Sequence, residues 1–207
     1  MRIIFGIGNP GRRYQYNRHN VGFMFLDYLA NSLSIQFTPS KSEYYFKEGK
    51  LNGQCFCLIK PSTFVNNSGI AALEAIQKYN IDIKDFLFVY DDLNLEFPLL
   101  RIRVSGGDGG HNGLNSIIYH LASEDFPRLR FGIGNDFEKG KMADYVLTDF
   151  TEKEMAQLRN VFDEGIVLTK EFIKGGIKNM LDANSILSKN KNSTNLSIDS
   201  KSNSEKS

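Results

Sequence analysis

The residues of this chain whose types suit chemistry fall in four short polar clusters, separated by apolar sequence. In chain order they are residues 9–19, 60–69, 90–94 and 106–113. Together they supply one histidine that is a candidate base, an acidic pair and several asparagines. This set suits general base catalysis, because an imidazole can take a proton from water near neutral pH, a carboxylate can orient that ring, and amides can bind a neutral substrate.

His19 is the candidate base, and Asp91 is the candidate for its supporting carboxylate. His19 follows the apolar run 2–8 and a turn of Asn, Pro and Gly, and it precedes an apolar stretch for which Asn20 has the type of an N-cap. Each residue also has a simpler explanation, since a histidine at a helix start is commonly a cap and an acidic pair after a strand is commonly a solvated turn. The position of all four clusters at element ends favours the functional explanation.

The elements that must position these clusters alternate between strands and helices. The predicted strands are residues 2–8, 43–49, 55–60, 86–90, 101–104 and 128–133. The predicted helices are residues 20–33, 67–79 and 113–122, and a last one that starts with the capping box Thr151/Glu154 and is interrupted by Gly165 and Gly175-Gly176. The alternation predicts an α/β fold with a sheet covered on both faces. Since open α/β sheets bind ligands at the carboxyl ends of their strands, the four clusters should meet on one rim.

Length and composition favour one domain. The chain has 207 residues, 41% of them hydrophobic, and a formal net charge of +1, so any nucleic-acid contact must use a local basic patch. No apolar run reaches 18 residues, and the N-terminal run is too short for a signal peptide, so we expect a cytoplasmic protein without membrane contact. From residue 188 the sequence is mostly Ser, Asn and Lys, which predicts a globular domain over 1–187 and a disordered tail over 188–207.

Several familiar sites are missing from the sequence. Cys55 and Cys57 should share one face of a strand as buried thiols, and no further ligands are patterned around them, so we expect no metal. Neither a Gly-x-Ser-x-Gly elbow nor a P-loop occurs. Gly6-x-Gly8-x-x-Gly11 matches the dinucleotide fingerprint, but a polar stretch follows it in place of a helix.

The four clusters resemble the motifs of the bacterial-type peptidyl-tRNA hydrolase family. The matching segments are Gly6-Ile7-Gly8-Asn9-Pro10-Gly11-x-x-Tyr14-x-x-x-Arg18-His19-Asn20-x-Gly22, Lys60-Pro61-x-Thr63-Phe64-x-Asn66-x-Ser68-Gly69, Asp91-Asp92-Leu93 and Gly109-Gly110-His111-Asn112-Gly113-Leu114. The similarity runs from residue 1 to about 183. It implies a monomeric single-domain α/β enzyme with a mixed central sheet, which cleaves the ester joining a peptide to the 3′ ribose of tRNA without metal or organic cofactor.

The resemblance also implies residue roles. His19 would be the general base, Asp91 would stabilise its proton-accepting form, and Asn9 would distinguish blocked from unblocked aminoacyl-tRNA. Substrate contacts around the acceptor end of tRNA would come from Tyr14, Phe64, Asn66 and Asn112.

Three arginines are candidates for the RNA backbone. Arg101 and Arg103 alternate on one predicted strand, so both should point to one face, and the resemblance implies that they hold phosphate. It also makes Arg130 a partner for a terminal 5′ phosphate, which suits the two-pronged guanidinium group. The simpler explanation is that exposed strand arginines only add solubility.

The sequence departs from the usual family pattern at four places: Asn17, Val65, Asn94 and Pro98-Leu99. None of these removes a proposed catalytic group, although Val65 alters the wall beside the ester and Leu99 removes one possible phosphate contact. Two other functions remain open. A non-catalytic RNA-binding relative of the same fold would not need His19 with Asp91, and an esterase of small molecules would not need the arginines.

Overall fold

The computed structural model describes the backbone of residues 1–204 and the side chains of residues 1–190. Within this part of the chain, a mixed sheet has the strand order β2-β3-β4-β1-β5-β7-β6. The strands are β1 Arg2–Gly6, β2 Thr38–Pro39, β3 Tyr44–Leu51, β4 Gln54–Pro61, β5 Phe86–Asp92, β6 Leu100–Arg103 and β7 Arg128–Gly132. The four central strands β4, β1, β5 and β7 are parallel, whereas β2 with β3, β3 with β4, and β6 with β7 pair antiparallel.

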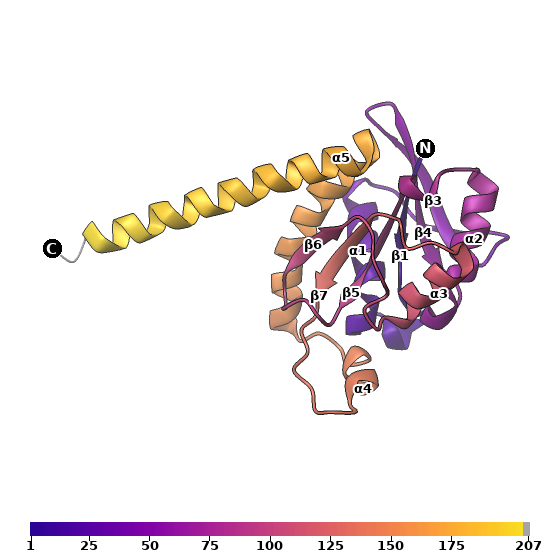
Figure 1. Ribbon diagram of the computed structural model, residues 1–207, viewed down its shortest axis with the longest axis horizontal. Helices are drawn as coiled ribbons and strands as arrows, with labels where there is room; N and C mark the ends of the chain where they lie inside the picture. The colour runs from indigo at the N-terminus through magenta and orange to yellow at the C-terminus, as the bar shows by residue number, and fades with distance from the viewer. Residues whose placement is uncertain (205–207) are drawn as a thin grey trace.

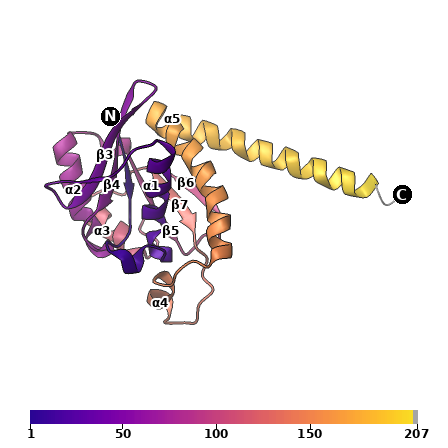
Figure 2. The same ribbon diagram turned by 180° about the vertical axis from the view of Figure 1, so that it is seen from behind.

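Helices cover both faces of this sheet. They are α1 Val21–Ser32, α2 Ser68–Tyr79, α3 Asn112–Leu121, α4 Met142–Val146 and α5 Glu152–Ser204. Helix α1 and the first half of α5 pack on one face, and α2 and α3 pack on the other (Figures 1 and 2). Short 3-10 turns precede several elements: Arg12–Tyr14, Arg18–Asn20, Val65–Asn67 and Ile83–Asp85. The predicted α/β class with a mixed central sheet is confirmed.

The central strands divide their side chains between the two helical layers. Ile4 packs in the core under α1 and α5, whereas its neighbours Ile3 and Phe5 pack in the core under α2 and α3. In β5, Val89 and Phe88 are divided in the same way. Because side chains alternate across a strand and both faces are buried here, these strands appear in the sequence as continuous apolar runs.

Every predicted strand and helix is present, with ends that differ by at most two residues. The sequence analysis missed β2 and α4, because two and five residues are too few to show a period. The expectation of two buried thiols is half wrong. Cys57 lies in the core, where burial raises its pKa to about 11, but Cys55 is exposed near the β3–β4 hairpin.

Helix α5 begins as predicted and breaks at one of the two expected places. The backbone N–H of Thr151 donates to Glu154 at 2.7 Å and the N–H of Glu154 donates to Thr151 Oγ1 at 3.3 Å, so the capping box is confirmed. The break lies at Gly176, whose φ of 73° suits glycine. The expected interruption at Gly165 is wrong: the helix continues, and a Cβ there would lie 2.8 Å from Phe25 of α1.

The second half of α5 projects away from the domain (Figure 1). It includes residues 188–204, whereas residues 205–207 and the side chains beyond residue 190 lie outside the described residues. Leu187 packs against the core under α1 and α5. The domain boundary at 187 and the disorder of the tail stay predictions.

We predict that the tail is dispensable for stability. Truncation after Ser188 keeps Leu187 and should leave the melting temperature unchanged, because it removes mostly polar residues. Truncation after Lys178 is the matched control: it also removes Met180, which is 0% exposed, and should destabilise by about 2–5 kcal/mol. Thermal unfolding of both variants checks this prediction. A large fall in melting temperature on truncation after Ser188 would contradict it.

Candidate active site

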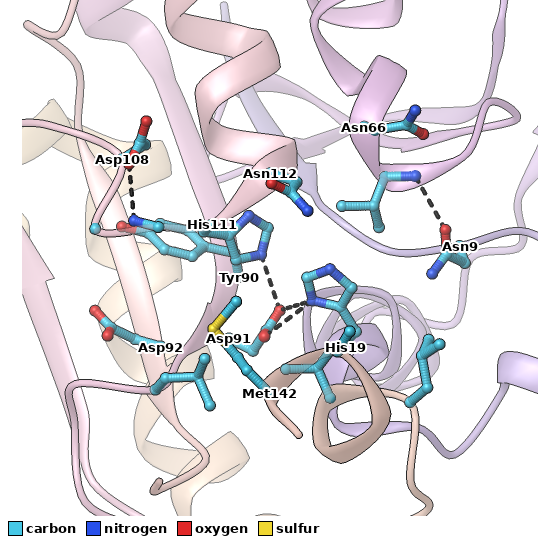
Figure 3. Close-up of a pocket in the computed structure, with 17 residues that line it drawn as sticks. Asn9, His19, Asn66, Tyr90, Asp91, Asp92, Asp108, His111, Asn112 and Met142 are labelled. Atoms are coloured by element: carbon cyan, nitrogen blue, oxygen red, sulfur yellow. Dashed lines mark hydrogen bonds and ion pairs between the residues drawn. The ribbon is translucent and has the colours of Figure 1, made fainter. Parts of the chain in front are cut away.

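A cavity of about 370 Å³ opens at the carboxyl ends of β1 and β5 (Figure 3). Its lining comes from all four polar clusters. The prediction that these clusters meet on one rim of the sheet is therefore confirmed. The lining residues from these clusters include Asn9, His19, Val65, Asn66, Tyr90, Asp91, Asp92, Asp108, His111 and Asn112. Helix α4 and the residue after it close one side with Met142, Val146 and Leu147.

His19 lies in the 3-10 turn Arg18–Asn20, directly before α1. This turn is fixed by its first residue, because Arg18 is mostly buried and donates to Glu154 at 2.6 Å and to the carbonyl of Asp149 at 2.8 Å. The Nδ1 atom of His19 lies 2.9 and 3.0 Å from the two carboxylate oxygens of Asp91. The spatial pair expected from the sequence is therefore present.

Asp91 has a second histidine partner. The Nε2 atom of His111 lies 3.0 Å from Asp91 Oδ1, and His111 Nδ1 accepts a hydrogen bond from the backbone N–H of Leu114 at 3.1 Å. The Asp91 side chain is only 2% exposed. Both ring nitrogens of His111 therefore have hydrogen-bond partners, so neither is available to accept a proton from a water in the cavity.

The electrostatics of the pair follow from burial and charge. Burial opposes ionisation of Asp91, but the charge interactions and hydrogen bonds of His19 and His111 outweigh it and hold the pKa of Asp91 below its usual range. Burial also opposes protonation of His19, but the charge and hydrogen bond of Asp91 raise the pKa of His19 above 6.5. The fraction of His19 that is able to accept a proton therefore grows as the pH rises, and it reaches a given level at a higher pH than in a free imidazole.

Three groups at the base of the cavity are close enough to hold a cation. One nitrogen each of His19 and His111 and one oxygen of Asp91 lie within 4.8 Å of one another. Metal binding at His111 Nε2 would require the proton to move to Nδ1, which already accepts the Leu114 N–H. The hydrogen-bonding pattern thus favours a proton-sharing group over a metal site.

Asn9 is held by Asn20, a role that sequence reasoning missed. The Asn20 side chain accepts from the backbone N–H of Asn9 at 2.8 Å and donates to its carbonyl at 2.9 Å. The expected side-chain cap of α1 by Asn20 is therefore wrong. Asn9 Oδ1 accepts the N–H of Val65 at 3.0 Å, which leaves its Nδ2 as the group that can donate to a ligand.

Comparison with known proteins identifies the family. A family profile described as "Peptidyl-tRNA hydrolase" matches residues 3–194. The chain is 44% identical to peptidyl-tRNA hydrolase of Caldanaerobacter subterraneus subsp. tengcongensis over 84% of this chain and 91% of that protein, and 40% identical to the one of Bacillus cytotoxicus over 84% and 93%. The chain belongs to the peptidyl-tRNA hydrolase family. The crystal structure of peptidyl-tRNA hydrolase from Acinetobacter baumannii has a TM-score of 0.83 at 30% identity, covering 88% of this chain and 93% of that one.

Family membership confirms the resemblance seen in the motifs, and it makes this chain a hydrolase. Of the expected substrate contacts, Asn66, in the 3-10 turn before α2, and Asn112, at the start of α3, both line the cavity (Figure 3). Tyr14 and Phe64 lie farther out, with ring centroids 6.2 Å apart and edge to face. Phe64 is 50% exposed, so this aromatic pair offers a surface on which a base or side chain can pack.

The three arginines expected to contact RNA do not share one environment. Arg101 and Arg103 are both exposed on β6, at the edge of the sheet, as their alternation predicts. Arg130 lies opposite Arg101 on β7, but its Nη1 donates to Asp92 at 2.6 Å. A phosphate at Arg130 must therefore compete with, or add to, an existing ion pair.

Sequence reasoning also missed how the glycine-rich cluster is held. Arg128 is 1% exposed, and its guanidinium donates to the carbonyls of Gly106, Gly107 and Glu124. Its position in a predicted strand beside Phe126 gave no indication of this contact. This buried arginine fixes the loop that leads to His111 and Asn112.

We predict that Asp91→Asn lowers the titration midpoint of His19. The substitution removes the charge that favours the imidazolium and leaves the burial that opposes it, so the midpoint should move to lower pH. Imidazole NMR signals measured against pH check this. Asp108→Asn, which removes a carboxylate from the same cavity without contact to His19, is the control and should leave the midpoint in place. An unmoved midpoint in Asp91→Asn would contradict the assignment.

Proposed function

We propose that this chain hydrolyses the ester between a peptide, or an N-acyl amino acid, and the 3′ ribose of tRNA, with His19 as general base. The observation that carries the proposal is the contact of His19 Nδ1 with the ionised carboxylate of Asp91, which implies that the proton of the neutral ring is on Nδ1. Because its Nδ1 donates to Asp91, the free electron pair is on Nε2, which points into the cavity (Figure 3). A water placed there loses its proton to Nε2 and attacks the ester carbonyl.

The rest of the reaction needs only hydrogen bonds. The carbonyl oxygen gains charge as the water attacks, and the side-chain amides of Asn9, Asn66 and Asn112 are the donors around the cavity that can stabilise it. His19 then returns its proton to the departing ribose oxygen. No covalent enzyme intermediate and no cofactor take part. The products are free tRNA and the released peptide.

Neutral amides also favour a blocked substrate. The amide of a peptidyl group can hydrogen-bond to Asn9, whereas the ammonium of an unblocked aminoacyl-tRNA would lose water without gaining a carboxylate partner there. Asn9 thus suits the role of distinguishing the two. This selectivity protects aminoacyl-tRNA that is ready for translation.

The RNA partner is bound beside the cavity. Arg101 and Arg103 present two cations on the edge strand β6, and Arg130 lies opposite Arg101 on the neighbouring strand β7. They are placed to contact phosphates of the acceptor stem. Tyr14 and Phe64 supply a stacking surface near the 3′ end.

The setting of the reaction follows from the substrate. Peptidyl-tRNA released early from ribosomes is found in the cytoplasm, and we propose that the chain acts there as a monomer. Among the described residues, no helix is long and apolar enough to cross a membrane.

A non-catalytic RNA-binding protein of the same fold is the alternative. It would use the arginines and would have no need of a histidine paired with a carboxylate. The His19–Asp91 contact at 2.9 Å, in a cavity lined with amide donors, supports the enzyme over that alternative.

The proposal predicts that wild-type protein hydrolyses N-acetyl-aminoacyl-tRNA and that His19→Ala loses about 10²–10⁴ of kcat, since a general base contributes about that factor. Binding of tRNA should persist, because His19 makes no contact with the arginines. Release of the acetylated amino acid measures turnover, and filter binding measures affinity. His120→Ala, which removes a histidine outside the cavity, is the control. Near-normal turnover in His19→Ala would overturn the assignment.

A second prediction concerns the arginines. Arg101→Ala should raise KM for the full-length tRNA substrate about 5–30-fold and reduce the salt dependence of kcat/KM, while leaving a minimal nucleoside ester unaffected. Lys50→Ala is the matched control, because Lys50 is also an exposed strand cation but lies on β3, across the sheet from β6. An equal loss on both substrates would place Arg101 in the chemistry or in folding instead.

A further inference from the structure

His111 has two hydrogen bonds that together determine where its proton lies. The backbone N–H of Leu114 donates to Nδ1 at 3.1 Å, so Nδ1 carries the lone pair and Nε2 carries the hydrogen. That hydrogen points to Asp91 Oδ1, 3.0 Å away. Leu114 belongs to the first turn of α3, and His111 is the N-cap of this helix. The helix start therefore sets the tautomer of a side chain in the cavity.

We propose that His111 is a positioning residue that holds the Asp91 carboxylate and withdraws part of its charge from His19. The proposal rests on the proposed function, because it assigns His111 a role in preparing the base of that reaction. Nothing in the sequence distinguishes this histidine from a helix cap. In the structure, His111 both caps α3 and contacts Asp91.

The argument for charge sharing comes from the geometry of one oxygen. Asp91 Oδ1 accepts from His111 at 3.0 Å and lies 2.9 Å from His19 Nδ1. Two N–H donors therefore share one acceptor oxygen. Oδ2 lies 3.0 Å from the same His19 nitrogen. If the His111 donor is removed, both oxygens serve His19 alone. Asp91 then becomes a stronger acceptor for the protonated imidazole, and His19 is less often in the form that can accept a proton.

The charged groups around His111 are few. Asp91 lies on β5, and His19 lies in the turn before α1 with its ring centroid 4.7 Å from that of His111. Asp108, whose carbonyl accepts the His111 N–H, lies in the glycine-rich loop. Tyr90 packs edge to face at 5.1 Å, and burial raises the pKa of its phenol, so it remains neutral. Asp91 is thus the carboxylate that His111 directly contacts among these groups.

Two substitutions separate the two tasks of His111. His111→Asn places an amide oxygen near the position of Nδ1, so it can still accept the Leu114 N–H, but it has no donor that reaches Asp91. His111→Gln places an amide N–H near the position of Nε2, so it can still donate to Asp91 with a weaker helix cap. His111→Asn removes the hydrogen bond to Asp91 and keeps the helix cap. His111→Gln keeps the hydrogen bond to Asp91 and weakens the helix cap.

The decisive measurement is the NMR titration of His19 in the whole protein. The chain has three histidines, so the imidazole spectrum is simple to assign. We expect the His19 midpoint to move to higher pH in His111→Asn and to stay near the wild-type value in His111→Gln. The melting temperature should fall more in His111→Gln than in His111→Asn. His120→Gln, a histidine replacement outside the cavity, should change neither midpoint nor activity.

Activity gives an independent reading of the same shift. Below the His19 midpoint, kcat/KM for N-acetyl-aminoacyl-tRNA should fall about 3–10-fold in His111→Asn, since each pH unit of displacement is worth a factor of ten, and the loss should shrink at higher pH. A merely structural role would lower activity equally at all pH values.

Two results would overturn the proposal. One is a His19 midpoint in His111→Asn equal to that of the wild type, and the other is an equal displacement in both variants. The NMR titration needs no substrate, so its outcome is separate from the fate of the proposed function. If wild-type protein failed to hydrolyse N-acetyl-aminoacyl-tRNA while the midpoints moved as expected, the reaction would be wrong and the coupling of the three residues would stand.

Discussion

The buried carboxylate of Asp91 is the constraint on which the site depends. An ionised carboxylate at 2% exposure is strongly unfavourable unless donors surround it. Its donors are His19, from the turn before α1, and His111, at the start of α3. These two helices lie on opposite faces of the sheet, so one side chain at the end of β5 ties together the two layers of the fold.

That arrangement requires both helix starts to approach the strand ends closely, and two glycines make the approach possible. A Cβ on Gly22, in the first turn of α1, would lie 2.4 Å from the carbonyl oxygen of Val89. A Cβ on Gly113, in the first turn of α3, would lie 2.7 Å from Ile7 and 2.8 Å from Val65. The glycines that follow His19 and Asn112 in the motifs are thus packing requirements that bring the two histidines within reach of one carboxylate.

The sequence predicted the strands and helices that position this site better than it predicted the hydrogen bonds within it. Strand and helix periods identified the elements, and the rule for open sheets correctly brought His19 and Asp91 together, because both depend on patterns that extend over many residues. The tautomer of His111 depends on a single backbone N–H, and the clamp of Asn20 on Asn9 replaced the helix cap that its residue type favours. Gly165 is a further example of a residue type that misleads. A glycine suggests a break in the helix, but here it allows close packing against Phe25. Contacts between residues distant in sequence decide such cases.

The acidic pair at the end of β5 shows how one strand end serves two purposes. Successive side chains of a strand point to opposite sides, so Asp91 and Asp92 cannot share a partner. Asp91 contacts the histidines, and Asp92 accepts from Arg130 at 2.6 Å on the neighbouring strand β7. In the proposed function Arg130 belongs to the phosphate-binding side, so a single peptide bond joins the carboxylate that prepares the base to the one that holds an RNA-binding arginine. Any movement of Arg130 toward a phosphate changes the charge balance of Asp92, one residue from the reaction centre. Under the proposed function, the strand end therefore places the carboxylate partner of the base and the carboxylate partner of the phosphate-binding arginine on one rigid element.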